Sequence, residues 1–371
     1  MNWQLKAWTQ NVVAALPMAD AVYYAIQRTR GSLRPGRVTP HEWFTAAVTM
    51  VEWIRSVGQE VQDKRFLEVG TGRMLGLPTA LWLCGAAETV TIDLNAYLSE
   101  ALVAESNRYM REHRSEILKL FRAEAAPPGF RERFQRLVGF SGSLTSFMQM
   151  TNTRYLAPAD ATALPFPDER FDFHVSHAVL EHVPCAAVAQ VLGEAKRLLR
   201  PNGLLVHVID PSDHFSHDDT SILAVNFLKF EEREWERWAG NKFSYHNRLR
   251  ACEYVKLFEA AGLRIIHQTQ TIDEPSLALL KNGFPLATRF RPIRPEDLAV
   301  RSLNLMASKA DADSAGPSRA AGAGVLTQVP ADPAPAQIPG FREPARDDRG
   351  RPSDHRLAPP DYVSVPGCRE G

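Results

Sequence analysis

The sequence predicts an α/β fold in which helices cover both faces of a doubly wound, mostly parallel sheet. Short apolar or β-branched runs alternate with longer stretches of helical periodicity, as expected for a parallel sheet with crossover helices. A glycine-rich loop follows the first of these runs, where such folds turn from strand to helix beside a ligand. The runs that we expect to form strands are residues 65–70, 89–94, 171–177, 203–210, 263–270 and 300–309.

Composition and periodicity divide the chain into three parts. Residues 1–63 show helical periodicity and are expected to form an N-terminal helical cap. Residues 64–310 carry the strand–helix alternation, with insertions near 95–156 and 211–250 that are longer than common loops and should contain helices. Residues 311–371 are rich in proline, glycine and alanine, and we expect them to be disordered because they bury too little apolar surface to offset chain entropy.

Charge and hydropathy narrow the classes of partner. The 371 residues include 43 Lys plus Arg and 43 Asp plus Glu, so the formal net charge is zero and we expect no nucleic-acid partner. No apolar run approaches the roughly 18 residues that a membrane-spanning helix needs. The N-terminus lacks the pattern of a secretory signal. We therefore expect a cytoplasmic protein without a membrane span.

The segment 66–93 has the pattern strand, glycine loop, helix, strand. Its loop contains Gly70, Gly72 and Gly76, and glycines at such a turn let the backbone bend sharply and approach a ligand closely. Asp93 ends the next strand, where a carboxylate can accept hydrogen bonds from both hydroxyls of an adenosine ribose. The segment therefore predicts a site for a cofactor that contains adenosine.

Two classes of cofactor fit this outline. A dinucleotide-binding loop would have its third glycine at position 75, which is Leu75 here, and it needs a free helix N-terminus for the pyrophosphate. S-adenosylmethionine has no phosphate and presents an ammonium group, which suits Glu68, an acid two residues before the first glycine. The loop alone favours S-adenosylmethionine, while a dinucleotide site and a plain strand–helix turn stay open.

Two later motifs carry a resemblance to a known family. Residues 160–172 read DATALPFPDERFD and lead into FHVSHAVLEHVP, and residues 196–210 read KRLLRPNGLLVHVID. Together with the glycine loop, these motifs resemble the type-11 branch of the class I S-adenosylmethionine-dependent methyltransferase superfamily, over about residues 60 to 270. The resemblance implies a Rossmann-like fold with a seven-stranded sheet, S-adenosyl-L-methionine as the cofactor, and methyltransferase activity. Asn202 stands where the family usually has the first of two glycines.

The resemblance also implies which residues bind the cofactor. The glycine loop and the acid before it would hold the methionine part, Asp93 the ribose, and Asp160 the adenine amino group. His177 would lie near the transferred methyl group. Arg73 and Met74 depart from the family, which often has another glycine there, and this puts the conformation of the loop in question. The implied cofactor-binding residues are Glu68, Gly70, Thr71, Gly72, Asp93, Leu94, Asp160, Ala161 and His177.

Histidines near the carboxyl ends of two neighbouring strands are the candidate catalytic residues. Methyl transfer mainly requires alignment, and it needs a base only where the acceptor is a hydroxyl or a protonated amine. Histidine is the usual base near neutral pH, and the candidates are His177, His182 and His214. His207 lies inside a strand and is expected to be a core residue. Two aspartates and two histidines in the loop 210–217 either cap turns or hold a divalent ion, and we expect no metal site.

These observations predict a small-molecule methyltransferase, with O-methylation of a sugar or secondary metabolite as the first hypothesis. The candidate histidines and a donor-rich stretch at 241–250, which either contacts the acceptor or forms a solvated loop, motivate the choice of oxygen. The alternative within enzymes is C- or N-methylation of a quinone-like or lipidic acceptor, which an apolar pocket lining would favour. A binding protein that kept the fold without catalysis is the alternative outside enzymes.

Overall fold

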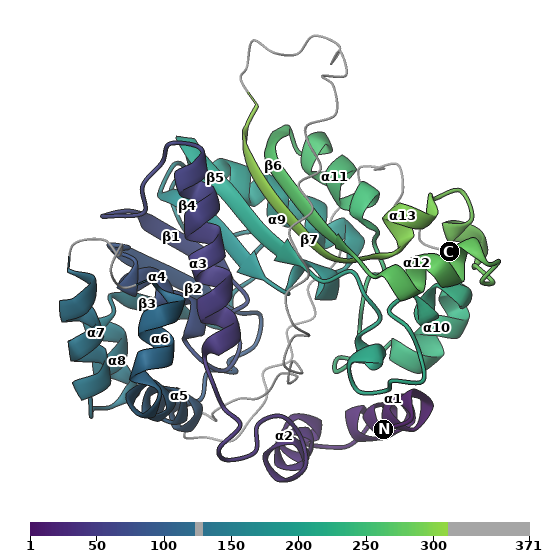
Figure 1. The fold of residues 1–371 in the computed structure, drawn as a ribbon, viewed down its shortest axis with the longest axis horizontal. Helices are drawn as coiled ribbons and strands as arrows, with labels where there is room; N and C mark the ends of the chain where they lie inside the picture. The colour runs from purple at the N-terminus through teal and green to yellow at the C-terminus, as the bar shows by residue number, and fades with distance from the viewer. Residues whose placement is uncertain (123–128, 311–371) are drawn as a thin grey trace.

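A seven-stranded sheet forms the centre of the molecule, as shown by a computed structural model that describes residues 1–122 and 129–310 (Figure 1). The strands are β1 (Arg65–Val69), β2 (Glu88–Ile92), β3 (Thr153–Leu156), β4 (Phe171–His177), β5 (Leu199–Ile209), β6 (Leu263–Ile272) and β7 (Val300–Lys309). Their order is β3-β2-β1-β4-β5-β7-β6. Strands β1 to β5 pair in parallel, and β7 runs antiparallel between β5 and β6. The prediction of a Rossmann-like, mostly parallel seven-stranded sheet is confirmed. The tail predicted to be disordered, 311–371, lies outside the described residues.

Helices and short 3₁₀ turns connect the strands. The α-helices are α1 (Trp3–Ala14), α2 (Ala19–Thr29), α3 (His41–Ser56), α4 (Gly76–Leu83), α5 (Glu100–Glu112), α6 (Arg114–Leu120), α7 (Phe130–Gly139), α8 (Leu144–Met150), α9 (Cys185–Leu198), α10 (Glu232–Ala239), α11 (Ala251–Ala260), α12 (Glu274–Lys281) and α13 (Pro295–Leu298). The 3₁₀ turns are η1 (Leu180–His182), η2 (His214–His217), η3 (Asn226–Lys229) and η4 (Thr288–Phe290). None of the helices in the described ranges has both the length and the apolar character to cross a membrane.

Alternate residues of each strand face two different helical layers. In β5, Leu204 and Val206 belong to the core that includes α3 and α4, whereas Leu205 and Ile209 pack with α9 and α11. Successive side chains of a strand point to opposite faces, so a strand covered on both faces must be apolar throughout. This double burial explains the apolar run at the centre of β5.

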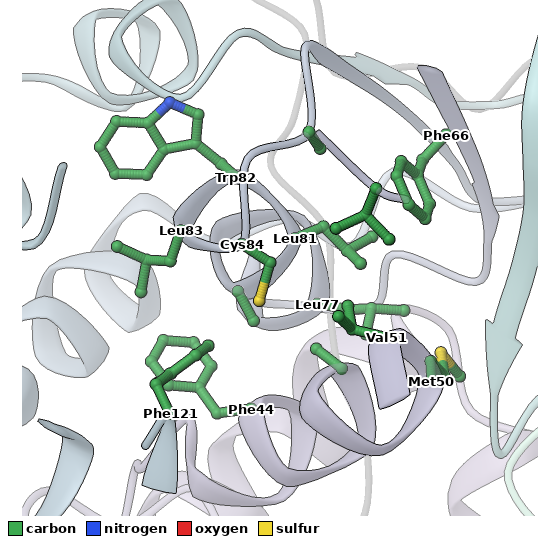
Figure 2. Close-up of a cluster of buried hydrophobic side chains, with 14 of the residues drawn as sticks. Phe44, Met50, Val51, Phe66, Leu77, Leu81, Trp82, Leu83, Cys84 and Phe121 are labelled. Carbon is green, nitrogen blue, oxygen red and sulfur yellow. The ribbon is translucent and has the colours of Figure 1, made fainter. Parts of the chain in front are cut away.

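The N-terminal helices divide between two parts of the molecule. Helix α3 crosses the face of the sheet, and its Phe44 and Met50 join Leu77 and Leu81 of α4 in the largest buried cluster (Figures 1 and 2). Helices α1 and α2 lie apart from the sheet, in the same region as α10 (Figure 1). Helix α3 is therefore part of the main core, and the division of the chain at residue 63 stays a prediction.

Helix α1 packs on the second insertion. The Trp3 ring lies 5.8 Å from the Phe215 ring and 5.6 Å from the Phe230 ring, measured between centroids. The backbone N–H of Trp3 donates to Asp219 Oδ2 at 2.7 Å. The beginning of the chain and the stretch 211–240 thus share a satellite core that is separate from the core of the sheet.

The first insertion contains the expected helices, α5 to α8, and also one strand that the sequence analysis missed. Strand β3 pairs in parallel with β2 at the edge of the sheet. It has only four residues, and Arg154 within it is exposed. Only one of its four residues is fully buried, so the strand needs no continuous apolar run. The sequence therefore lacks the apolar signal by which the central strands were predicted.

Candidate active site

The strand order determines where a ligand can bind. The order reverses between β1 and β4, and doubly wound folds bind ligands outside the carboxyl ends of the strands at such a switch point. The glycine loop leaves β1 at this point, and the segment 178–184 leaves β4 beside it. The two motifs that the sequence separates by about a hundred residues therefore meet in one crevice.

The glycine loop folds back over the end of β2. Gly70 and Gly72 have φ angles of 87° and 63°, in the left-handed region that side chains other than glycine rarely adopt. The backbone N–H groups of Gly70 and Thr71 donate to the carbonyl of Ile92 at 2.8 and 3.1 Å. The loop conformation is thus fixed by the backbone, and Arg73 and Met74 after it are compatible with the turn.

Gly70 also permits a close approach between the two motifs. A Cβ atom at this position would lie 2.3 Å from Val179 Cγ2, well inside van der Waals contact. Val179 directly precedes η1, which contains the Leu-Glu-His motif. Gly70 therefore lets the glycine loop pack directly against the segment that follows β4, which brings the two motifs together.

Glu68 lies below the loop and is 3% exposed. Its carboxyl accepts a hydrogen bond from the Thr91 hydroxyl, and Thr91 Oγ1 lies 2.6 Å from Thr71 Oγ1. Burial raises the pKa of Glu68 to about 8. The carboxyl is therefore largely protonated at neutral pH and supports the loop through two hydroxyls. Its contact with the methionine ammonium stays a prediction.

Asp93 sits at the end of β2, facing the loop. The N–H of Gly72 donates to Asp93 Oδ2 and the N–H of Asn95 to Oδ1, each at 3.0 Å. A carboxylate has about four lone-pair positions, so each oxygen can accept one more hydrogen bond. Burial raises the pKa of Asp93 above its usual range. Leu94, the next residue, is 67% exposed.

Asp160 and Ala161 follow β3 in a turn attached to Asp93. The N–H of Ala159 donates to the backbone carbonyl of Asp93 at 2.9 Å. Asp160 is exposed, and its Oδ1 accepts from the N–H and the hydroxyl of Thr162 at 2.9 and 2.7 Å. Ala161 is half-buried. The structure thus brings the residues predicted for adenine and ribose to adjoining segments.

His177 lies at the end of β4, opposite an acid that the sequence analysis missed. Its Nδ1 is 3.9 Å from Oε1 of Glu42, on α3. Burial lowers the pKa of His177 to about 4, so the imidazole is neutral at physiological pH. Burial, and then the negative charge of Asp210, raise the pKa of Glu42 to about 7. No feature of the sequence linked the amphipathic helix α3 to the site.

His182 has a fixed orientation in η1. Its Nδ1 lies 2.9 Å from the carbonyl oxygen of Tyr245. A carbonyl can only accept, so Nδ1 carries a proton and Nε2 of the neutral ring keeps its lone pair. The His182 ring lies 4.9 Å from that of His214 and 6.0 Å from that of His246, between centroids. His246, which the sequence analysis placed only in the donor-rich stretch, is thus a member of this cluster.

The four acids and histidines of the loop 210–217 have separate roles. Asp210 Oδ2 lies 3.6 Å from His214 Nε2 and 3.4 Å from His217 Nε2. Burial lowers the pKa of His214 to about 3, which keeps its ring neutral. Asp213 points elsewhere, because its Oδ1 accepts from the N–H of Phe215 at 2.9 Å and caps η2. Asp213 therefore caps a turn, whereas Asp210 lies in the cluster of possible ligands.

Glu181 is a fully buried acid that the sequence analysis did not single out, although it is the middle residue of the Leu-Glu-His motif. Its Oε1 accepts a hydrogen bond from the N–H of Asp210 at 3.3 Å. Its Oε2 is buried without a hydrogen-bond partner among the described residues. Burial raises the pKa of Glu181 well above its ordinary value.

A cavity of about 50 Å³ opens beside the histidines. Its walls come from α1, η1, η2 and the insertion around α10, which are far apart in the sequence. Aromatic rings supply the apolar part of the lining, and histidines supply much of the polar part. The lining residues are Lys6, Gln10, His182, Asp213, His214, Phe215, Phe227, Trp235, Phe243, Ser244 and His246.

Most of the donor-rich stretch 241–250 stabilises the fold through buried hydrogen bonds. The sequence analysis expected either contacts with the acceptor or a solvated loop, and neither describes this role. The Arg248 guanidinium donates to the carbonyls of Phe227 and Phe230 at 3.0 and 2.7 Å. Arg250 donates to a backbone carbonyl at 2.6 Å and is buried. These buried cations hold the second insertion against the sheet.

His207 is a core residue, as expected. It is fully buried in β5, where its Nδ1 lies 2.6 Å from Ser176 Oγ and its Nε2 lies 3.2 Å from His174 Nδ1. Both ring nitrogens are therefore occupied within the sheet, and His207 takes no part in the site.

The chain is similar to several known proteins. Residues 130–207 match the family model of a methyltransferase domain. An uncharacterized protein of Haemophilus influenzae is 44% identical over 48 residues, which is 13% of this chain and 19% of that protein. A solved S-adenosylmethionine-dependent methyltransferase from Mesorhizobium loti is 17% identical, covering 70% of this chain and 96% of its own, with a TM-score of 0.36. One from Methanosarcina mazei is 19% identical, covering 70% and 97%, with a TM-score of 0.35.

The domain match covers only part of the fold. The matched residues run from α7 through the Leu-Glu-His motif into β5. The glycine loop lies outside that range, at the end of β1. Residues 130–207 match a methyltransferase domain and lie within a Rossmann-like sheet, and both findings agree with the resemblance to the class I S-adenosylmethionine-dependent methyltransferases.

Proposed function

We propose that the protein O-methylates a small hydroxylated molecule, such as a sugar or a secondary metabolite. The observation that carries the proposal is the position of His182 and His214, which line a cavity at the carboxyl end of the sheet. The segment that carries His182 begins at the contact between Val179 and the glycine loop. A hydroxyl in the cavity would thus lie beside the cofactor crevice.

Residues of the first half of the sheet would hold the cofactor. The free lone pairs of Asp93 suit the ribose hydroxyls, the glycine loop suits the methionine part, and Asp160 suits the adenine amino group. When bound, S-adenosylmethionine supplies a methyl group that its sulfonium has already activated. The protein then has to align the acceptor and exclude water, which are the main contributions of an enzyme to such a displacement.

His182 is the best-placed base for a hydroxyl acceptor. The Tyr245 carbonyl holds its Nδ1 proton, which leaves the Nε2 lone pair to accept the proton of the hydroxyl. His214 and His246 next to it are neutral rings, because burial lowers the pKa of each. When His182 takes up the proton it becomes an imidazolium. A charged neighbouring ring would repel it, whereas these neutral rings do not.

The second candidate is C- or N-methylation of a quinone-like or lipidic acceptor. The apolar part of the cavity lining favours it, because Phe215, Phe227, Trp235 and Phe243 offer ring faces to a flat acceptor. This candidate shares the cofactor site with the first and differs in needing no base for a carbon or a neutral amine.

A two-stage experiment tests the proposal. Calorimetric titration with S-adenosylmethionine comes first, and absence of binding at high micromolar concentrations would reject the methyltransferase function. Product mass is then measured across sugar, phenol and amine acceptors, where we expect a gain of one methyl on a hydroxylated compound. His182→Gln should lower kcat for that compound by about 10²- to 10⁴-fold, the usual contribution of a positioned base, with unchanged cofactor affinity. Methylation of carbon or nitrogen alone, insensitive to His182→Gln, would favour the second candidate.

A further inference from the structure

We propose that Glu181, His182 and His214 form a binding site for a divalent transition-metal cation of the zinc type, open toward the cavity. Each residue offers one ligand atom, and the three atoms lie within 4.8 Å of one another. Two imidazoles and one carboxylate are a common ligand set for catalytic zinc, which leaves a further coordination position for water or substrate. Zinc binds such ligands at roughly 2.0–2.2 Å, so small side-chain movements of about an ångström complete the site.

The orphaned carboxylate oxygen of Glu181 is the first independent sign of a ligand. Glu181 is fully buried, and its Oε2 has no hydrogen-bond partner among the described residues. Its Oε1 is held by the N–H of Asp210 at 3.3 Å, which leaves Oε2 for the ion. A buried polar atom without a partner destabilises the fold, and more so when it is charged, so an ion at this position would remove that cost.

The two histidines already have the state that a metal requires. The Tyr245 carbonyl fixes the proton of His182 on Nδ1, at 2.9 Å, and so presents the Nε2 lone pair. Metal-bound histidines almost always donate their other ring N–H to a carbonyl or carboxylate in this way. His214 Nε2 is buried without a hydrogen-bond partner in the described part of the chain.

Asp210 supplies the surrounding negative charge without filling the ligand position. Its Oδ2 lies 3.6 Å from His214 Nε2, longer than a hydrogen bond, and its Oδ1 accepts from the N–H of Ser212 at 2.9 Å. Acids next to the ligands raise affinity for a divalent cation and orient the coordinating rings. The proposed set differs from the cluster that the sequence suggested, because Asp213 caps η2 and Glu181 takes its place.

The cation would face the acceptor, because His182 and His214 both line the cavity. A hydroxyl in the open coordination position would lose its proton more readily, as water bound to zinc does. With the cation bound, the Nε2 lone pair of His182 would be a ligand and could not also act as the base. The proton would then pass to solvent or to another base, the oxygen would keep its electron pair for the methyl group, and His182→Gln would lower kcat through loss of the cation. This role rests on the proposed function, whereas binding of the cation does not.

Zinc titration of the full chain, freed of any histidine tag and dialysed against a chelator, tests the site. We expect one equivalent of Zn²⁺ by calorimetry and a rise in the unfolding temperature with added Zn²⁺. His182→Ala and His214→Ala should each weaken binding by about 100-fold, because loss of even an outer-shell partner costs 10- to 100-fold. His113→Ala, at an exposed histidine on the opposite insertion, should bind as the parent does.

Several outcomes would overturn the proposal. Absence of stoichiometric binding, or binding that both ligand variants retain, would reject the site. His182 is exposed, so its variant should fold even where a Glu181 variant fails, and circular dichroism checks this. Cofactor titration separates the two proposals: S-adenosylmethionine binding without Zn²⁺ binding rejects the metal alone, and Zn²⁺ binding without any methyl product rejects the function alone.

Discussion

The two halves of the crevice are built in different ways. On the cofactor side, backbone groups and residues close in sequence determine the geometry: Gly70 and Thr71 donate to the end of β2, and Gly72 donates to Asp93. On the acceptor side, side chains determine it, and they come from α1, η1, η2, η3, α10 and the stretch before α11. The first half can therefore form as a single strand–loop–helix–strand unit, whereas the second requires segments that are distant in the sequence to assemble.

This difference has consequences for stability and for function. A backbone loop tolerates changes in most side chains but not a Cβ atom at a close approach. A cluster of side chains depends on the satellite core that supports it, which includes Trp3 and Phe215. We expect substitutions to separate the two halves, with acceptor-side changes leaving cofactor affinity intact.

The largest effect should come from Trp3→Ala, which removes the ring that joins α1 to the second insertion. Trp3 is 5% exposed and lies within 6 Å, between ring centroids, of Phe215 and Phe230. Truncation of a buried tryptophan costs about 3–5 kcal/mol, so the free energy of unfolding of the satellite core should fall by that amount. Denaturant titration followed by hydrogen exchange of α1 and α10 measures it, and affinity for S-adenosylmethionine should not change.

Trp8→Ala is the matched control, since Trp8 is on the same helix and 59% exposed. We expect its effect to stay within about 0.5 kcal/mol. Equal losses from the two variants would mean that burial of the Trp3 ring does not stabilise the satellite core. A loss of cofactor binding with Trp3→Ala would show that the two halves are one cooperative unit.

Gly70→Ala should have the next largest effect, and on the cofactor side. The added Cβ meets Val179 Cγ2 at 2.3 Å, and the φ angle of 87° is itself unfavourable for alanine. Overpacking costs roughly 1–3 kcal/mol, and a left-handed conformation about 1–2 kcal/mol more. We expect a loss of stability near their sum and weaker S-adenosylmethionine binding in calorimetry.

Gly58→Ala separates the two contributions, because Gly58 has a φ of 77° and no atom within 4 Å of the added Cβ. It should show only the conformational cost. Adding Val179→Ala to Gly70→Ala should recover part of the difference by removing the clashing methyl group. If Gly58→Ala and Gly70→Ala cost the same, the contact with Val179 has no energetic role.

The same contrast explains what the sequence could predict. The α/β class, six of the strands and the cofactor loop follow from apolar runs and from glycines next to them, which are local signals. Strand β3 was missed because an edge strand of four residues has no such run. The positions of His182 and His214 near each other followed from strand ends, but the cavity itself did not, because Trp235 and Lys6 meet only in the folded chain.

Acids of the site were the hardest to predict, for a physical reason. Glu42 is one charged residue in an amphipathic helix, where an acid usually faces solvent. Glu181 is buried, although charged residues are rarely buried without a partner. In both cases the tertiary environment, and not the local pattern, decides what the carboxyl does.

Glu68→Gln should produce the smallest effect at the acidic end of the pH range, and it tests how far the cofactor side depends on one side chain. The folded-state pKa of Glu68 is raised from its ordinary value to about 8 by burial, with a hydrogen bond from Thr91 acting in the opposite direction. Below the unfolded-state pKa, near 4.5, the carboxyl is protonated in both states and its contribution to stability is fully present. As pH rises toward 8, only the unfolded state gains by ionising, so the parent protein loses stability across this window.

Glutamine keeps the carbonyl that accepts from Thr91 and cannot ionise, so Glu68→Gln should flatten this part of the pH profile. A tenfold difference between the ionisation constants of the folded and unfolded states corresponds to about 1.4 kcal/mol, so the variant should gain stability relative to the parent as pH rises from 4.5 toward 8 and should be the more stable of the two at pH 9. Denaturant titrations at intervals from pH 5 to about 9 measure the difference. Glu112→Gln, at an exposed position on α5, should reproduce the profile of the parent. Parallel profiles for Glu68→Gln and the parent would mean that Glu68 is ionised in the folded protein. A charged carboxylate, and not the neutral hydrogen-bond chain through Thr91 and Thr71, would then stabilise the loop.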